Sequence, residues 1–114
     1  MDAILQRLTE LDDVSGAILV GKDGLIVTGT LHSEDEEVIG AMSAAAFGSI
    51  SNYAQQINQG EIRHTSIETQ IGTIQLAEVS DLILIVTTRH TANLGRVRVE
   101  MKKVCRQILP LVTA

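Results

Sequence analysis

The sequence predicts an α/β fold, a three-layer α-β-α sandwich around a five-stranded, mainly antiparallel sheet, with the element order α-β-β-α-β-β-β-α. Three observations predict it. Three segments repeat apolar residues at spacings of three and four, as amphipathic helices do. Turn signals between β-rich runs indicate hairpins, which join antiparallel neighbours. The run LILIV at 82–86 is typical of a central strand covered on both faces, so helices are expected on both sides of the sheet.

The first three elements follow from local patterns. A short helix is predicted over residues 2–11, where apolar residues recur on one side: Ile4, Leu5, Leu8 and Leu11. The apolar runs 16–21 and 25–29 are predicted to be strands. Asp23-Gly24 between them favours a hairpin, because glycine supplies the positive φ that tight hairpin turns require.

A long second helix is predicted from Glu34 to Asn58. Ser33 and Glu36 have the spacing of a capping box at its start, and Gly60 provides a stop shortly after its end. One broad apolar arc of this helix is expected to face the domain's own core. Its members are Val38, Ile39, Met42, Ala46, Ile50, Tyr53 and Ile57.

The opposite side of the same helix carries small residues three or four apart, namely Gly40, Ala44, Gly48 and Ser51, with Phe47 beside them. Small residues at this spacing let another helix approach closely. A solvated face is the alternative interpretation, but each interior glycine costs a helix about 1 kcal/mol relative to alanine. A domain of 114 residues has one core and can cover only one face of this helix, so the small-residue face predicts a partner.

The last four elements complete the order. Residues 61–69 alternate only weakly between apolar and polar, which predicts a strand at the edge of the sheet. The strand 73–79 follows, and Ser80-Asp81 closes a hairpin to the central strand 82–86. The final helix is capped by Asn93 and carries an apolar stripe of Leu94, Val97, Met101, Val104, Ile108 and Leu111.

Composition and charge restrict the function classes. The net charge of −5, with one Phe and one Tyr, argues against nucleic acid as a partner. The single cysteine, Cys105, cannot form an internal disulfide and is expected to be a buried small hydrophobe. No segment has the length of a transmembrane span or the pattern of a signal peptide, so a cytoplasmic protein is expected.

Basic residues gather on the final helix: Arg96, Arg98, Lys102, Lys103 and Arg106. A solvated outer face is the ordinary interpretation of such a cluster. An acidic partner or membrane headgroups is the alternative.

No motif for catalysis, cofactors or metals stands out. The chain lacks a P-loop, and no serine lies in G-x-S-x-G. His32, His64 and His90 are far apart and have no companion at metal-ligand spacing. No catalytic, cofactor-binding or metal-binding residues are therefore predicted, and an enzyme is not expected.

Motifs along the whole chain carry a family resemblance. They are GAILV at 16–20 with DGL at 23–25, the alanine-rich second helix, and ANLG at 92–95 leading into Glu100-Met101. In this order they resemble the roadblock, or dynein light chain, family, whose fold is profilin-like. The resemblance covers one domain, residues 1–114. It implies a non-catalytic homodimer or heterodimer in which the second helix and the third strand meet their counterparts.

The resemblance also implies site residues. The dimer interface is expected at Gly40, Ala44, Phe47, Gly48, Ser51, Arg63, Thr65 and Ile67. Similar bacterial and archaeal members act with small Ras-like GTPases through the surface of the paired second helices, which makes Phe47, Ser51 and Gln55 candidates for partner binding. A mechanism that holds the GTPase switch loops in one state is preferred over an arginine finger from Arg63 or Arg89, because any surface arginine meets that description.

The expected function is thus a homodimeric regulator or adaptor of a small Ras-like GTPase. The alternative is a structural scaffold subunit of a motor or signalling complex with no nucleotide-dependent partner. A small-molecule sensor is the weakest hypothesis, because the chain has few aromatic residues to line a cavity.

Overall fold

A computed structural model describes residues 1–30, 35–90 and 92–113 and confirms the predicted element order. The helices are α1 (Asp2–Thr9), α2 (Glu36–Gln56) and α3 (Leu94–Val112), and the strands are β1 (Val14–Gly21), β2 (Ile26–Gly29), β3 (His64–Glu68), β4 (Gly72–Val79) and β5 (Leu82–Arg89). The predicted cap of α2 by Ser33 and its start at Glu34 lie outside the described residues. Its described N-cap is Asp35.

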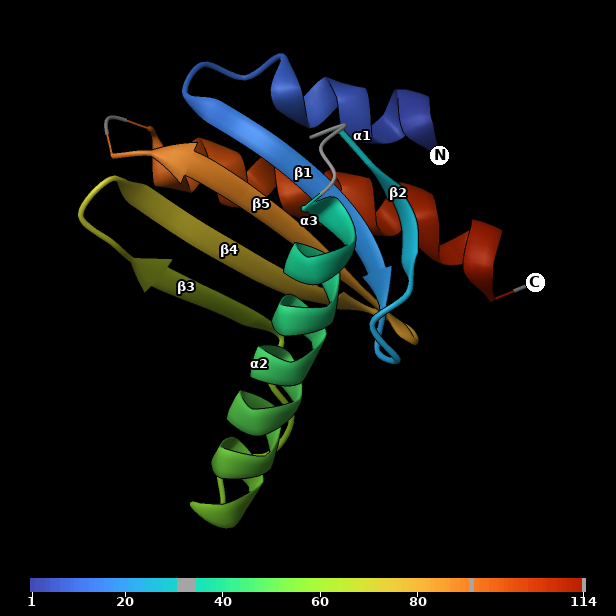
Figure 1. Cartoon of the computed structure of the whole chain (residues 1–114), viewed down its shortest axis with the longest axis vertical. Coiled ribbons are helices and arrows are strands. Elements are labelled where there is room, and N and C mark those ends of the chain that lie inside the picture. Colours follow the sequence, from blue (N-terminus) through green and yellow to red (C-terminus); the bar gives the residue numbers. More distant parts are fainter. Residues whose placement is uncertain (31–34, 91, 114) are drawn as a thin grey trace.

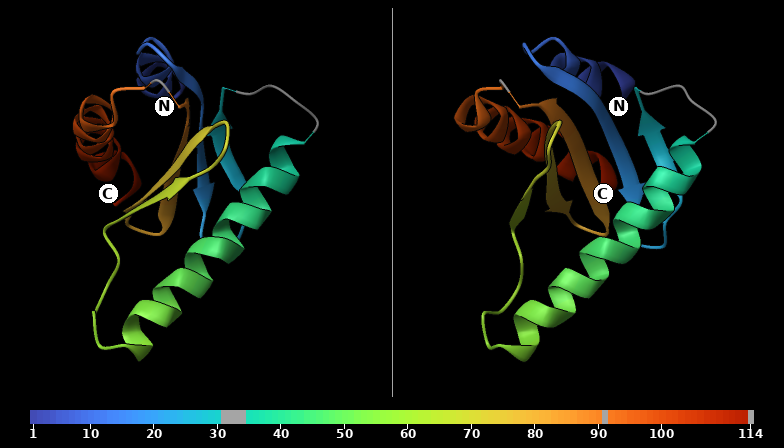
Figure 2. Two further views of the ribbon diagram at one scale, coloured as in Figure 1. Left: turned by 90° about the vertical axis from the view of Figure 1, so that its left-hand side faces the viewer. Right: turned by 60° about the vertical axis from the view of Figure 1, so that its left-hand side comes forward.

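All neighbouring strands are antiparallel and follow the order β2-β1-β5-β4-β3. The apolar run 82–86 therefore lies in the central strand, and β3 lies at an edge, as predicted. Figures 1 and 2 show α1 and α3 on one face of the sheet and α2 on the other. The three-layer sandwich is confirmed.

Two of the predicted local signals are visible in the backbone. Gly24 has a φ of +91° in the turn between β1 and β2, where its lack of a side chain is required. The Asn93 side chain accepts a hydrogen bond from the backbone N–H of Arg96 at 3.2 Å, which satisfies one of the free donors at the start of α3.

The sheet separates two cores. The larger lies under α1 and α3 and includes Leu5, Leu8, Leu19, Leu84, Met101 and Ile108. The smaller lies under α2 and contains Ile18, Val20, Ala44, Phe47, Leu76, Ile83 and Ile85. Among the residues of the predicted α3 stripe, Leu111 is exposed, because it lies near the end of the helix and outside the core cluster.

The prediction of which side of α2 faces the core was wrong. The helix buries Gly40, Ala44 and Phe47 against its own sheet. The predicted core arc is instead half-buried or exposed along its whole length: Val38, Ile39, Met42, Ala46, Ile50, Tyr53 and Ile57. A Cβ on Gly40 would lie 3.0 Å from Cγ1 of Ile26, so the small residues serve to bring α2 close to the sheet of its own chain.

A buried polar network lies on the other face of the sheet, across β3, β4 and β5. Gln75 is fully buried; its amide donates to Ser66 Oγ at 2.8 Å and to Thr73 Oγ1 at 3.1 Å, and its Oε1 accepts from His64 Nε2 at 2.7 Å. Thr73 and Thr88 also join their hydroxyls at 2.7 Å. Each buried polar atom of this network thus has a partner.

Within the described residues, no helix has both the length and the apolar character needed to span a membrane.

Candidate functional site

The outer face of α2 is an exposed apolar surface. Val38 is 58% exposed, Met42 67% and Tyr53 65%. Scattered apolar residues are ordinary on protein surfaces, but several side by side on one helix face mark an interaction site. We call this set, with Ile57, the outer arc of α2.

The outer arc continues into an apolar groove between α2 and strands β3 and β4. The groove has a volume of about 260 Å³ and is lined by Ile39, Met42, Ser43, Ala46, Ile67, Ile74 and Leu76. It exists because α2 packs mainly on β1 and β2 and covers β3 and the neighbouring part of β4 less fully, so that Ile67 and Ile74 are only half-buried while Leu76 is buried. Ile67 and Ile74 are directly opposite each other in the β3–β4 ladder, so together they form its floor.

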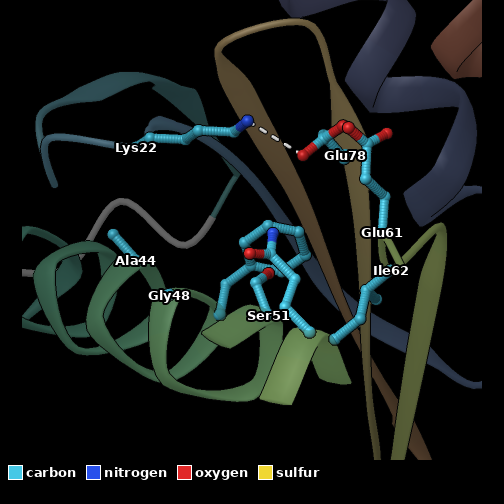
Figure 3. Close-up of a pocket in the computed structure, with 9 residues that line it drawn as sticks. Lys22, Ala44, Gly48, Ser51, Glu61, Ile62 and Glu78 are labelled. Carbon is cyan, nitrogen blue, oxygen red and sulfur yellow. Dashed lines mark ion pairs between the residues drawn. The ribbon is translucent and has the colours of Figure 1, made fainter. Parts of the chain in front are cut away.

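A second, more polar hollow lies beneath the C-terminal half of α2. Its volume is about 270 Å³, and it is lined by Lys22, Ala44, Phe47, Gly48, Ser51, Gln55, Glu61, Ile62 and Glu78. Figure 3 shows Lys22 reaching towards Glu78, with Gly48 and Ser51 on the α2 side and Glu61 and Ile62 opposite. Lys22 Nζ lies 2.8 Å from Glu78 Oε2. Because both side chains are partly exposed, this ion pair stabilises the hollow by less than about 1 kcal/mol.

The shape of α2 explains why the hollow exists. The C-terminal half of the helix extends beyond the sheet, and the connection to β3 returns alongside it (Figure 2). The hollow lies where the helix, this connection and the β1–β2 turn meet. Its rim therefore combines residues from segments far apart in the sequence, such as Lys22 and Gln55.

The predicted site residues fall into three groups. Gly40, Ala44 and Phe47 are buried in the protomer's own core. Gly48, Ser51 and Gln55 line the polar hollow beside Phe47. On β3, Thr65 and Ile67 are half-buried on the face towards α2, while Arg63 is exposed before the strand.

Sequence reasoning missed Met42 and Tyr53 as surface residues. It treated the largest side chains of α2 as the core, which is the usual rule for an amphipathic helix. The available signal was the stripe of small residues, which fits close packing on the helix's own sheet as well as packing on a partner. The stripe is not uniform in this respect. A Cβ on Gly40 would press on Ile26, whereas a Cβ on Gly48 would meet no atom within 4 Å, so Gly48 is not needed for packing within the protomer.

Among the described residues, the side chains that could bind a metal ion are scattered rather than clustered. No group of three or more His, Cys, Asp or Glu residues able to hold a metal ion occurs among the described residues, a set that excludes His32. Cys105 is half-buried next to the larger core, and its burial raises the thiol pKa to about 11, an effect that Arg106 partly offsets.

A family model for the Roadblock/LC7 domain matches residues 1–88. The chain belongs to the Roadblock/LC7 family. This Roadblock/LC7 protein is 36% identical over 109 residues to the uncharacterized protein MJ1340 of Methanocaldococcus jannaschii, a match that covers 95% of this chain and 96% of the relative. The family expected from the sequence motifs is thus confirmed.

Solved structures show the same fold. A Roadblock/LC7 domain from Streptomyces avermitilis is similar with a TM-score of 0.93 and 16% identity, over 100% of this chain and 98% of that one. Myxococcus xanthus MglB gives a TM-score of 0.89 and 20% identity, over 96% and 91% of the two chains. Acanthamoeba castellanii profilin IB gives 0.68 and 15%, over 96% and 94%. The fold is profilin-like, as predicted.

Proposed function

We propose that this Roadblock/LC7 protein is a non-catalytic homodimer that regulates or adapts a small Ras-like GTPase in the cytoplasm. The observation that carries the proposal is the outer arc of α2 with the adjoining apolar groove. The protomer exposes Met42 and Tyr53 on α2 and leaves Ile67 of β3 and Ile74 of β4 only half-buried, so the α2 layer is incomplete at this edge of the sheet. The apolar outer arc of α2 from another copy is suited to cover this apolar groove.

The proposed dimer is isologous, so the same groove is filled on both copies. The outer arc of α2 from one copy packs against Ile67 and Ile74 of the other, where the apolar groove accepts it. The edge strand β3 presents unpaired backbone groups, which a second β3 is suited to satisfy. Arg63, Thr65 and Ile67 then lie at the interface, as the family resemblance implies.

The interface proposal changes for α2. Gly40, Ala44 and Phe47 are covered by their own sheet and support the helix from within. Met42, Ala46 and other residues of the outward side of α2 take the role of contacting the partner helix. We infer that Gly48, Ser51 and Gln55 remain near the interface, on the rim of the polar hollow.

We assign GTPase binding to the surface that the paired helices form around the polar hollow. The family resemblance supports a Ras-like partner. The structure contributes a recess with polar groups on its rim, Ser51 and Gln55, and Phe47 in its lining. Phe47 is 3% exposed, so its role is to support this surface from below rather than to insert into the partner.

The test is a pull-down with a Ras-like GTPase loaded with GDP or with a non-hydrolysable GTP analogue. We expect retention of one nucleotide state over the other, and weaker retention by Gln55→Arg, which places a long charged side chain at the hollow. Gln6→Arg is the matched control, because Gln6 is an exposed glutamine on α1. Equal retention of both states contradicts regulation and supports the structural scaffold alternative. Equal weakening by both variants contradicts the assigned surface.

A further inference from the structure

A separate groove lies on the other face of the sheet, between α3 and the edge strand β3. It has a volume of about 250 Å³ and is lined by Arg63, His64, Ala77, Glu78, Met101, Lys102, Cys105 and Arg106. We call it the α3–β3 groove. The Roadblock/LC7 match ends at residue 88, before α3 begins, so the residues of one wall lie outside the matched range.

The walls of the α3–β3 groove carry an excess of positive charge. Lys102 and Arg106 lie on α3, and Arg63, which directly precedes β3, lines the groove with them. The ion pairs among described residues involve Lys22 and Lys103, so these three cations are left without an acidic partner in that part of the chain. The one carboxylate in the lining, Glu78, is paired with Lys22. The groove is therefore suited to an anionic ligand.

The floor of the α3–β3 groove is apolar. Met101 is buried, Ala77 belongs to the larger core, and Cys105 packs against it. A bare phosphate or sulfate ion would gain nothing from such a floor. A ligand that offers both a carboxylate and an apolar side chain would use both parts of the groove.

We propose that the α3–β3 groove binds a short acidic peptide segment of a protein partner, with carboxylates on Lys102, Arg106 and Arg63 and an apolar side chain on Met101. Lys102 and Arg106 are four residues apart on α3, so they lie about 6 Å apart along one edge of the helix. Alternate residues of an extended peptide are spaced by about 7 Å. Two acidic residues at positions i and i+2 therefore match the two cations.

A peptide fits this groove better than a lipid surface does. A flat membrane would engage the outward side of α3 as a whole, including Lys103, rather than the recessed floor at Met101 and Cys105. The groove is built by one chain, and Met101, Lys102 and Arg106 lie on the face of the sheet opposite α2. It shares Arg63 with the proposed dimer interface and Glu78 with the polar hollow, so Arg106 is the cation that tests the groove separately from the dimer and from GTPase binding.

The experiment measures fluorescence anisotropy of a labelled peptide of Glu-Leu-Glu repeats, titrated with the full-length protein at low and physiological salt. The control peptide carries Gln in place of Glu. We expect saturable binding of the acidic peptide only, weakened about tenfold by Arg63→Glu or Arg106→Glu. Lys103→Glu is the matched variant, because Lys103 neighbours Lys102 on α3, does not line the groove and is paired with Glu100. It is expected to weaken binding less than about twofold.

A measurement on the unaltered protein complements the variants. Cys105 lines the groove, so bound acidic peptide should slow its alkylation by iodoacetamide at alkaline pH, whereas the Gln peptide should not. Equal weakening by Lys103→Glu and Arg106→Glu, binding of both peptides, or no protection of Cys105 would overturn the proposal. So would sedimentation with phosphatidylserine vesicles in the absence of peptide binding, which would assign the basic residues to lipid. Met42→Asp should leave peptide binding unchanged, so failure of the dimer and failure of the groove are distinguishable.

Discussion

Substitution of Met42 by aspartate tests the proposed homodimer. Met42 is 67% exposed in the protomer and lines the apolar groove. Complete burial of a methionine side chain stabilises by about 1.5–3 kcal/mol, so covering its exposed two thirds contributes about 1–2 kcal/mol per copy. In an isologous dimer the Met42 contact occurs twice, so the two copies together contribute about 2–4 kcal/mol to association. The dissociation constant should therefore rise by about 30-fold to about 1,000-fold.

The assay is sedimentation equilibrium or light scattering over a dilution series, with circular dichroism to confirm that each variant is folded. The matched control is Leu25→Asp, because Leu25 is 70% exposed in the β1–β2 turn and lines neither the apolar groove nor the polar hollow. It should leave the dimer intact. A Met42→Asp variant with unchanged mass, equal dissociation by Leu25→Asp, or an unaltered protein that is monomeric at high micromolar concentration would refute the reasoning.

Four further predictions concern stability and reactivity. Gly48→Ala should raise the free energy of unfolding by up to about 1 kcal/mol in urea titration, because a Cβ there meets open space and alanine favours the helix, whereas Gly40→Ala should gain less because its Cβ would press on the sheet; an equal gain at both positions would show that Gly40 is not closely packed. Asn93→Ala should lower the free energy of unfolding by about 1 kcal/mol and Asn93→Ser should recover most of it, and no loss in Asn93→Ala would mean that the N-cap hydrogen bond contributes nothing. Alkylation of Cys105 should reach half its maximal rate near pH 11 rather than near the ordinary value of 9.0, because burial disfavours the thiolate, and Arg106→Glu should shift this midpoint upward by removing a cation that lowers the pKa. A midpoint near pH 9 in the folded protein would contradict the burial of this thiol. The same raised pKa makes the folded state lose stability as the pH rises from about 9 towards 11, since the unfolded chain then releases the proton first.

Local patterns were sufficient to predict the layout of the fold. The pair Asp23-Gly24 predicted the β1–β2 hairpin, because glycine readily adopts the positive φ that Gly24 has in this turn. The uninterrupted apolar run 82–86 predicted the central strand. The weak alternation around β3 identified an edge. These features depend on residues close together in the chain, so one sequence contains all the information that they need.

The orientation of α2 was not predictable in the same way. Nearly the whole circumference of this helix is apolar or small, so periodicity gives little indication of which side meets the sheet. Close approach at Gly40 decides it, and that contact depends on Ile26 in another element. The α3–β3 groove was predictable only in part. The sequence shows the basic residues of the last helix and raises an acidic partner as one alternative, but it does not show that Arg63 lies across from Arg106, because only the folded chain brings these two residues together.

The buried Gln75 has a consequence for how the edge strand β3 is aligned. Sliding β3 by two residues along β4 keeps each side chain on the same face, so apolar burial alone discriminates poorly between the two alignments. The amide of Gln75 does discriminate, because Ser66 and His64 flank it only in the observed pairing, and a buried amide deprived of partners costs about 1–3 kcal/mol per lost group. The buried side chain of Gln75 thus sets the register of β3 on β4. Any strand from another chain that paired with the edge strand β3 would inherit this register.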